Sequence, residues 1–501
     1  MGTRCWIGIP LPNLVMRRWL TVTAISAGIV LRLLGYCRNR SLWFDEAAVA
    51  TNIVERPLSG LFRPLEFHQG APVGFLVVEK LLTYLLGPSE FVLRLLPLFC
   101  GLLVVFLTAR MAQLYIDQSA VLLAIALVAL NPSLIYYSSE VKQYSSDALT
   151  TLLLLWMFVA LAQSDLSAKK VFAFGLMGAA AVWFSHPAAF LLASAAGICL
   201  VSTRTEWQRF IRLAFVLGMW AASFLILYFV SLRHLANDIA LLDFWGQYFP
   251  PHGFAHTVGW LFDVFAASFR DPAGLAVIPG MAFFVVGVAV LFRRNRRLGW
   301  IVCGSCIATL LAAFAHRYPL GGRLLLFAVP IILLLVAEGV AAVCARCPRG
   351  KLVHVVIACL VLALPLLNAI RGGARSVSGI QRDDIRPVLE YVNAHASPAD
   401  GGYVYFQAQP QMRYYSDVLG GRVKWKLGSD CGADATCYAK DVDSLTGSGR
   451  TWIVLSHVLI RDKTDDRAIL VEELDKRGRR LEEFSTHSAH AYLYDLGRDK
   501  R

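Results

Sequence analysis

Long apolar runs repeat along the first three quarters of the chain and limit the kind of fold that it can adopt. Residues 121–130, 149–162 and 324–343 are long or closely spaced enough to build helices across a membrane core of roughly 30 Å, which takes about 20 residues per helix. Hydrophobic residues make up 57% of the 501 positions and charged residues only 17%, which is unlike a soluble domain. The sequence therefore predicts an α-helical membrane protein that crosses the bilayer many times.

Eleven spans are predicted from these runs. The first covers residues 19–36 and lacks a small-residue cleavage site, so we interpret it as a retained span and not as a signal peptide. Residues 171–202 are predicted to form two short helices around Ser185, His186 and Pro187. One long helix there is the alternative, and it would move the C-terminal end across the membrane. The remaining spans are predicted near residues 94–114, 119–136, 145–163, 213–232, 273–292, 298–316, 323–344 and 352–370.

The positive charges predict the orientation of these spans. Arg17 and Arg18 precede the first span and predict a cytoplasmic N-terminus, and the later basic clusters fall on the same side. Those clusters are Arg110, Lys169 with Lys170, Arg204 with Arg209 and Arg212, Arg293 with Arg294, Arg296 and Arg297, and Arg346 with Arg349 and Lys351. The net charge of +13 thus reflects orientation in the membrane, and no nucleic-acid partner is expected.

An odd number of spans places the C-terminal tail on the outer side. The tail alternates helix-like and strand-like runs and predicts a small α/β domain. Its helices are expected over 383–395 and 466–478, and its strands over 403–407, 452–456 and 491–496. The chain is therefore predicted to consist of a transmembrane domain, 1–370, whose outer loop 37–93 carries interfacial helices, and an outer-face domain, 371–501.

The eleven cysteines show no spacing typical of a metal site, and no cofactor is expected, although the need for a divalent cation stays open. Cys303, Cys306, Cys344 and Cys359 resemble small apolar packing residues. Cys431 and Cys437 differ, because they lie in a polar loop of the tail. They are close enough in sequence for a local disulfide if the tail lies in an oxidising compartment.

The first outer loop begins with two adjacent carboxylates, Asp45 and Glu46, directly after the first span. In one interpretation Asp45 caps a short interfacial helix that starts near Ala47. In the other it is a general base for a membrane-embedded substrate, because apolar surroundings raise the basicity of a carboxylate and a nearby cation restores it to a working range. The local sequence favours neither.

The same loop continues with His68, a candidate substrate-binding residue, and with an apolar stretch over residues 73–87. This stretch predicts an amphipathic helix along the membrane interface, with Glu79 and Lys80 on its exposed polar face.

A third outer element, residues 136–144, places hydroxyls, an acid, a base and an amide between two spans. Mixed polar and aromatic groups of this kind bind sugars, so Glu140, Lys142 and Tyr144 are candidate substrate-binding residues. Taken singly, Glu140 and Lys142 are better explained as exposed loop charges.

The fourth outer element, residues 316–323, is a turn rich in Gly and Pro that contains Arg317 and Arg323 and precedes a continuous apolar helix. A guanidinium at a helix N-terminus, next to free backbone N–H groups, suits a phosphate or pyrophosphate. An arginine that reaches lipid headgroups is the alternative.

Together these elements resemble the bacterial members of the protein O-mannosyltransferase superfamily, which are glycosyltransferases of family 39 type with the GT-C membrane fold. The resemblance rests on the Asp45-Glu46 pair and on segments 87–97, 136–140 and 318–323. It extends to the transferases that add galacturonic acid to lipopolysaccharide or aminoarabinose to lipid A.

The resemblance implies inverting transfer of a sugar from a polyprenyl-phosphate donor to a hydroxyl of a glycan, lipid or protein, at the outer face of the inner (plasma) membrane and among its lipids. Asp45 matches the family's catalytic carboxylate. Arg323, with Lys142, would stabilise the leaving phosphate, and Glu46 and Glu140 would orient hydroxyls. Many relatives carry Arg where this chain has Lys142, and His-Pro-Pro where it has His68-Gln-Gly-Ala-Pro72.

A transporter or flippase for a lipid-linked sugar is the alternative function. We find no internal repeat and no matching pair of broken helices in the two halves, which transporters often have. The polar residues also cluster at one membrane face and not in the middle of the spans, which favours an enzyme.

Overall fold

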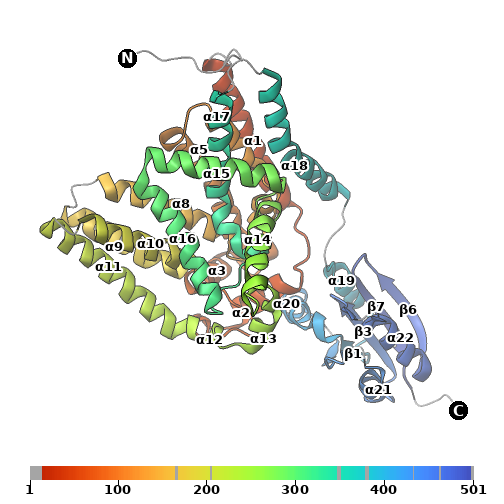
Figure 1. Ribbon diagram of the computed structural model, residues 1–501. Coiled ribbons are helices and arrows are strands. Elements are labelled where there is room, and N and C mark those ends of the chain that lie inside the picture. Colours follow the sequence, from red (N-terminus) through yellow and green to blue (C-terminus); the bar gives the residue numbers. More distant parts are fainter. Residues whose placement is uncertain are drawn as a thin grey trace.

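The computed structural model describes residues 14–163, 167–203, 206–346, 351–378, 383–421, 423–432, 434–461 and 464–497. A bundle of apolar helices is followed by a small domain with a β-sheet (Figure 1). The prediction of a helical membrane protein with a C-terminal α/β domain is confirmed.

Helices occupy each of the eleven positions predicted for spans. They are α1 (Leu14–Cys37), α5 (Leu95–Tyr115), α6 (Val121–Leu130) with α7 (Pro132–Tyr136), α8 (Tyr144–Gln163), α9 (Ala168–Phe184), α10 (Ala188–Thr203), α11 (Trp207–Leu227), α15 (Val277–Arg294), α16 (Arg296–Phe314), α17 (Val329–Arg346) and α18 (Lys351–Ser378). Among the described residues, seven helical segments are long and apolar enough to cross a membrane, or eight if a bent pair in 121–139 is one span. The count of eleven therefore stays a prediction.

Two breaks in these helices have local causes. The bent pair turns by 53° between Leu130 and Pro132, where proline cannot continue the hydrogen bonding of the helix before it. The side chain of Asn131 accepts the N–H of Leu134 at 2.8 Å and so caps the second helix. Helices α9 and α10 are separate, as predicted, with the break at residues 185–187.

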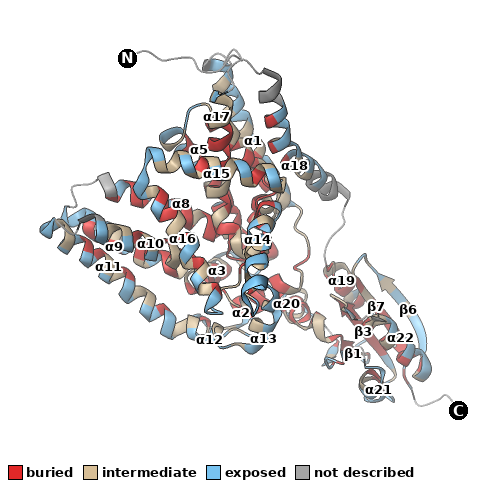
Figure 2. Ribbon diagram, viewed as in Figure 1, coloured by how far each residue is buried: buried red, intermediate tan, exposed pale blue. Residues whose placement is uncertain are grey.

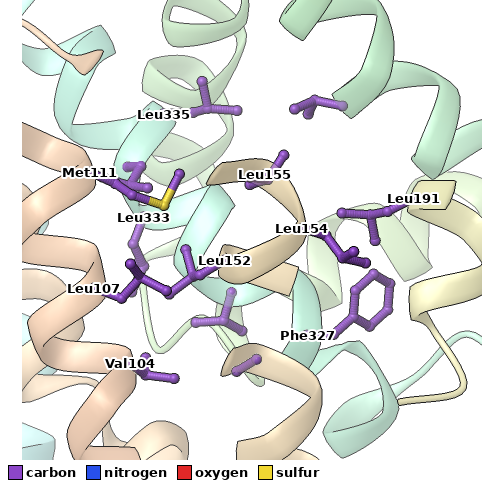
Figure 3. Packing of buried hydrophobic residues seen from close by; sticks show 14 of the residues in the cluster. Val104, Leu107, Met111, Leu152, Leu154, Leu155, Leu191, Phe327, Leu333 and Leu335 are labelled. Carbon is purple, nitrogen blue, oxygen red and sulfur yellow. The ribbon is translucent and has the colours of Figure 1, made fainter. Parts of the chain in front are cut away.

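The core of the bundle lies between α5, α8 and α17. Figure 3 shows Leu107 of α5, Leu152 of α8 and Leu333 of α17 packed together, all of them buried. By contrast, α11 is largely exposed in Figure 2, and it presents Trp207, Ile211 and Phe215 outward. Exposed apolar side chains along a long helix are expected where the helix faces lipid.

Short helices gather at one end of the bundle, which we call the loop end (Figure 1). They are α2 (Phe44–Glu55), α3 (Val73–Leu86), α4 (Glu90–Leu93), α12 (Arg233–Leu235) and α13 (Ile239–Phe244), and the longer α14 (Phe254–Arg270) lies nearby. Helix α3 matches the predicted helix 73–87, but the prediction that Glu79 and Lys80 are exposed on its surface is wrong. Both are buried, since α3 packs between α2 and α9, and Lys80 Nζ donates to the carbonyl oxygen of Val54 at 2.8 Å.

The C-terminal domain is built on a five-stranded sheet with the order β2-β1-β3-β7-β6. Its strands are β1 (Gly401–Val404), β2 (Lys424–Leu427), β3 (Arg450–Ser456), β6 (Arg479–Ser485) and β7 (Ala489–Asp495), with β4 (Ile460–Arg461) and β5 (Thr464–Asp465) as a separate pair. Strand β1 pairs in parallel with β2 and β3, whereas β7 pairs antiparallel with β3 and β6. The helices are α19 (Arg386–His395), α20 (Gln409–Leu419), α21 (Ala435–Asp443) and α22 (Asp466–Arg477). Cys431 and Cys437 form a disulfide.

One hydrophobic cluster joins this domain to the loop end. It contains Ala50 and Ile53 of α2, Phe75 of α3, Tyr415 of α20 and Trp452 of β3, all of them buried. The C-terminal domain therefore shares part of its core with the first outer loop and is packed firmly against it.

Candidate active site

Asp45 lies in the first turn of α2, which is one of the short helices of the loop end. The helix begins at Phe44, and Trp43 occupies the capping position without a side-chain hydrogen bond, so Asp45 is not the cap of this helix. The small side chains of Ala47, Ala48 and Ala50 are fully buried and allow α2 to pack closely against its neighbours. The first turn of the helix thus carries the carboxylate into the interior.

Two cations hold the carboxylate of Asp45. Lys142 Nζ lies 3.2 Å from Oδ1, and an Arg323 guanidinium nitrogen lies 2.6 Å from Oδ2. Burial alone would raise the pKa of Asp45, but the charges of Lys142 and Arg323 outweigh it and lower that pKa below its usual value. Asp45 is therefore ionised at neutral pH, and it is a weaker base than a free carboxylate.

Lys142 is buried and connects the first outer loop to the segment after α7. Its ammonium donates to Gln69 Oε1 at 2.6 Å as well as pairing with Asp45. Burial lowers the pKa of Lys142, and the charge of Asp45 opposes this effect. The prediction that Lys142 is an exposed loop charge is wrong, because this segment folds in against Asp45.

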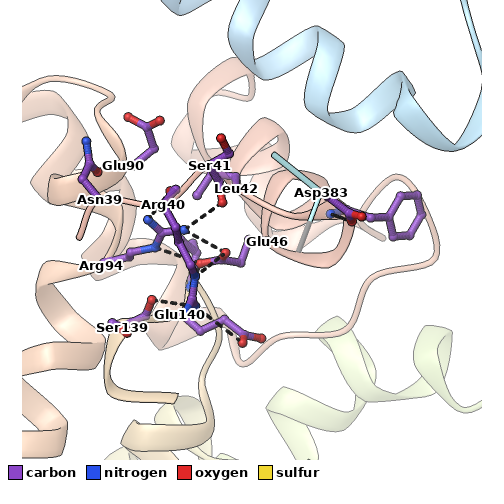
Figure 4. Close-up of polar contacts among 12 residues, drawn as sticks. Asn39, Arg40, Ser41, Leu42, Glu46, Glu90, Arg94, Ser139, Glu140 and Asp383 are labelled. Carbon is purple, nitrogen blue, oxygen red and sulfur yellow. Dashed lines mark hydrogen bonds and ion pairs between the residues drawn. The ribbon is translucent and has the colours of Figure 1, made fainter. Parts of the chain in front are cut away.

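Glu46, the next residue of α2, is the centre of a buried ionic network (Figure 4). Arg94 donates to its two oxygens at 2.9 and 2.8 Å, and the backbone N–H of Val141 donates at 2.9 Å. Arg40 Nε lies 3.7 Å away. Burial raises the pKa of Glu46, but Arg94 and Arg40 outweigh burial and hold that pKa below its usual value. This network ties α2 to α4, α5 and the segment after α7.

Removing one partner of this network is expected to destabilise the fold. In Arg94→Met the buried carboxylate of Glu46 loses its bidentate partner, and we expect the free energy of unfolding to fall by about 3–5 kcal/mol. Arg413→Met is the matched control. It breaks ion pairs with Glu55 and Glu66 that are partly exposed and are expected to contribute about 0–1 kcal/mol. Thermal unfolding of the purified protein in detergent measures both, and equal melting temperatures would contradict the structural role of Arg94.

Glu140 is fully buried next to this network, so the prediction that it is an exposed loop charge is also wrong. Arg40 lies 3.9 Å from its carboxylate, and neither oxygen accepts a hydrogen bond from any residue that the structure describes. Burial and the charge of Glu46 raise the pKa of Glu140 to about 7. Glu140 therefore retains acceptor capacity that its protein neighbours leave unused.

Arg323 is surrounded by aromatic rings. Its guanidinium carbon lies 5.5 Å from the ring centre of Trp245, 5.7 Å from that of Trp43 and 5.8 Å from that of Tyr144. Gly321, two residues before Arg323, packs closely against Tyr248. A Cβ at this position would lie 1.8 Å from the Tyr248 ring, so a larger residue does not fit there. As predicted, Arg323 stands at the start of a helical segment, which runs from Gly322 to Ala328 and continues into α17.

The predicted site residues separate into two groups. Asp45, Glu46, Glu140, Lys142, Tyr144 and Arg323 come together. His68 instead lies 3.0 Å from Asp238 with a largely exposed side chain, and Arg317 donates to the carbonyl oxygen of Ala236 at 2.9 Å. Within the described part of the chain, neither residue forms a hydrogen bond or an ion pair with Asp45.

Several residues at the site were missed in the sequence, namely Arg40, Gln69, Arg94 and Trp245. Arg94 lies within segment 87–97, on which the family resemblance partly rests, and that was the only signal for it. Among the described residues, no three His, Cys, Asp or Glu side chains are grouped as the ligands of a metal ion would be.

Comparison with known families identifies one match within the sequence. The model of the dolichyl-phosphate-mannose-protein mannosyltransferase family matches residues 69–234, a stretch that contains Gln69, Glu140 and Lys142 and excludes Asp45 and Arg323. No curated protein sequence matches the chain significantly.

Comparison with solved structures shows the fold. ArnT from Cupriavidus metallidurans bound to undecaprenyl phosphate is similar with a TM-score of 0.58 and 14% identity, over 94% of this chain and 97% of that one. The oligosaccharyltransferase of Archaeoglobus fulgidus, in a complex with Zn and sulfate, has a TM-score of 0.53 and 12% identity, over 95% of this chain and 73% of that one. The same archaeal enzyme with an inhibitory peptide and a dolichol-phosphate has a TM-score of 0.51 and 11% identity, over 95% and 74%.

Proposed function

We propose that this chain, which belongs by its fold to the GT-C glycosyltransferase superfamily, transfers a sugar from a polyprenyl-phosphate donor to a hydroxyl acceptor with inversion at the anomeric carbon. The observation that carries the proposal is the buried carboxylate of Asp45 held between Lys142 and Arg323. A base next to two cations suits attack on a sugar whose leaving group is a phosphate.

The nature of the donor is supported by what the similar proteins hold. ArnT was solved with undecaprenyl phosphate and the archaeal oligosaccharyltransferase with a dolichol-phosphate. We infer that the donor enters this chain from the bilayer and that its phosphate reaches Arg323 at the loop end. We place the loop end and the C-terminal domain on the outer face of the inner membrane, and the acceptor is a glycan, lipid or protein of the envelope.

The two cations have different tasks before and after the donor binds. Without the donor they neutralise Asp45. A bound donor phosphate competes for Lys142 and Arg323, and the basicity of Asp45 rises as these cations turn to the phosphate. Asp45 then takes the proton of the acceptor hydroxyl as that oxygen attacks the anomeric carbon, while Arg323 stabilises the charge that develops on the phosphate. A phosphate anion leaves without a general acid.

The two glutamates have separate roles in this scheme. The hydrogen bonds from Arg94 and Val141 occupy both oxygens of Glu46, so we assign Glu46 to holding α2 in place. Glu140 has unused acceptor capacity beside the site, and we assign it to a hydroxyl of the sugar or the acceptor. The rings of Trp43, Tyr144 and Trp245 around Arg323 offer apolar faces against which a sugar can stack.

The proposal is tested with purified protein and a panel of undecaprenyl-phosphate-linked sugars, with envelope extract as the source of acceptors. We expect release of free undecaprenyl phosphate from one donor, which depends on the extract. In vesicles that contain the protein, movement of an intact donor across the bilayer without any release would instead support the transporter.

The pH dependence of turnover tests the role of the cations. Asp45 works only when it is ionised. The ordinary pKa of an Asp side chain is about 4. Because the pKa of Asp45 is lowered, we expect kcat/KM to fall only at a pH below that value. In Lys142→Met the pKa of Asp45 rises, because one positive charge is lost, and we expect the acidic limb of kcat/KM to move to higher pH. Lys142→Arg keeps the charge and is expected to keep the limb in place. An unshifted limb in Lys142→Met would contradict the pairing with Asp45.

A further inference from the structure

The segment that carries Asp45 runs between the transmembrane helices and the C-terminal domain. We propose that the C-terminal domain completes the catalytic centre, and that Asp383 and His457 are positioning residues that hold the backbone of Phe44 and thereby aim Asp45. This inference rests on the proposed function of Asp45 as the base.

The direct link consists of one shared carboxylate oxygen. Oδ2 of Asp383 accepts the backbone N–H of Phe44 at 3.3 Å, and Nδ1 of His457 lies 2.8 Å from the same oxygen. The imidazole of His457 also stacks on the ring of Phe44, with ring centres 5.1 Å apart and an interplanar angle of 14°. Phe44 precedes Asp45 directly, so its backbone position fixes where the carboxylate points. Figure 4 shows Asp383 approaching this segment opposite to Arg94 and Glu140.

The backbone of both positioning residues is unusual. Asp383 has a φ of 45° and His457 a φ of 52°, which is the left-handed region that residues other than glycine seldom adopt. Conformations of this kind persist where the surrounding structure imposes them, and they are concentrated at functional sites. Two such residues that share one hydrogen bond indicate a contact with a specific task.

The neighbouring residues of the segment are held in the same way. The Leu42 N–H donates to the hydroxyl of Tyr415 at 2.8 Å, and its carbonyl oxygen accepts from Gln411 at 2.9 Å. The hydroxyl of Ser41 lies 2.6 Å from Asp384. All of these partners belong to the C-terminal domain, so the segment before Asp45 is bound on one side by that domain and on the other by the network of Glu46.

His457 also lies close to Trp43, which is an aromatic neighbour of Arg323. The ring centre of Trp43 lies 6.3 Å from that of His457 and 5.7 Å from the guanidinium carbon of Arg323. A shift of the C-terminal domain would therefore displace the base and an aromatic neighbour of the phosphate-binding arginine together. Displacing a catalytic group by about 1 Å lowers the rate roughly 10²-fold.

Two variants of His457 distinguish the effect of its side chain from that of its backbone conformation, and a third variant is the control. His457→Gly tolerates the left-handed backbone and removes the donor to Asp383. His457→Asn also tolerates it, and the amide nitrogen of Asn takes the place of Nδ1. His487→Gly is the matched control, because His487 is an exposed histidine of the same domain.

The readouts are the kcat and KM of donor turnover, binding of undecaprenyl phosphate alone, and hydrogen exchange of the backbone amides of residues 42–46. In His457→Gly we expect kcat to fall about 10- to 100-fold, with KM and the affinity for undecaprenyl phosphate within about twofold of the unchanged protein. The amides of residues 42–46 are expected to exchange about tenfold faster. His457→Asn and His487→Gly are expected to keep wild-type values.

Wild-type kcat and exchange in His457→Gly would overturn the inference. If His457→Gly does not fold, Asp383→Gly tests the same link, since it keeps the left-handed backbone and removes the shared acceptor. If the unchanged protein releases no undecaprenyl phosphate from any donor, the proposed function fails, and hydrogen exchange alone then decides whether the C-terminal domain holds this segment.

Discussion

Turnover by Asp45→Asn is expected to fall roughly 10²–10⁴-fold, because the amide has the shape of the carboxylate but cannot accept the proton of the acceptor hydroxyl. The substitution also removes the negative charge that engages Lys142 and Arg323. Both cations are then free for the donor phosphate, and we expect binding of undecaprenyl phosphate to be as tight as in the unchanged protein or tighter. Single-turnover release of undecaprenyl phosphate and direct binding measure the two effects separately.

Asp238→Asn is the control for this variant. Asp238 is a carboxylate at the same loop end, but its partner is His68. We expect Asp238→Asn to keep turnover within about threefold, because asparagine can also cap α13, where Asp238 accepts the N–H of Leu241. Asp45→Asn protein that is folded and turns over normally would remove Asp45 from the mechanism.

Arg323→Ala is expected to lower turnover about 10²–10³-fold, the effect found when one preorganised donor to a developing anion is removed. Unlike Asp45→Asn, it is expected to weaken the binding of undecaprenyl phosphate, because the phosphate loses its guanidinium. Arg323→Lys keeps the charge without the planar fork of the guanidinium. Its turnover is expected to lie between that of the unchanged protein and that of Arg323→Ala. Donor titrations that report kcat and KM for each variant provide the measurement.

Arg317→Ala serves as the control for Arg323. Arg317 lies six residues earlier in the same turn, and its guanidinium is exposed and donates to the carbonyl oxygen of Ala236. Normal turnover is expected for this variant. The assignment of Arg323 to the leaving phosphate is wrong if Arg317→Ala and Arg323→Ala are equally impaired.

The positions of the helices were predictable because the signal is local. Each apolar run reports its own burial in lipid or in the bundle, and proline and serine near residues 130 and 186 mark the breaks. Exposure was harder to predict, since it depends on what covers a helix. Glu79 and Lys80 have the spacing of an exposed polar face, yet α2 and α9 cover that face and Lys80 finds the carbonyl oxygen of Val54.

The candidate site was predicted only in part, because a local sequence signal marks some of its residues and not their partners. Asp45, Lys142 and Arg323 were each recognised in a loop, and the resemblance to the GT-C transferases, now confirmed at the level of the fold, implied that the loops meet. Their supporting partners carry no such signal. Arg94 lies 48 residues from Glu46, and Asp383 lies 339 residues from Phe44, so only the folded chain brings these pairs together.

Chemical analysis of the cell envelope tests the central claim most directly. Envelope glycans and lipid-linked sugars would be measured by mass spectrometry in cells that lack the gene and carry either the unchanged protein or Asp45→Asn. The proposed function predicts that one sugar is missing from one acceptor, that its polyprenyl-phosphate donor accumulates, and that only the unchanged protein restores the sugar. Restoration by Asp45→Asn, or an unchanged glycan profile with mislocated donor, would contradict sugar transfer by this site.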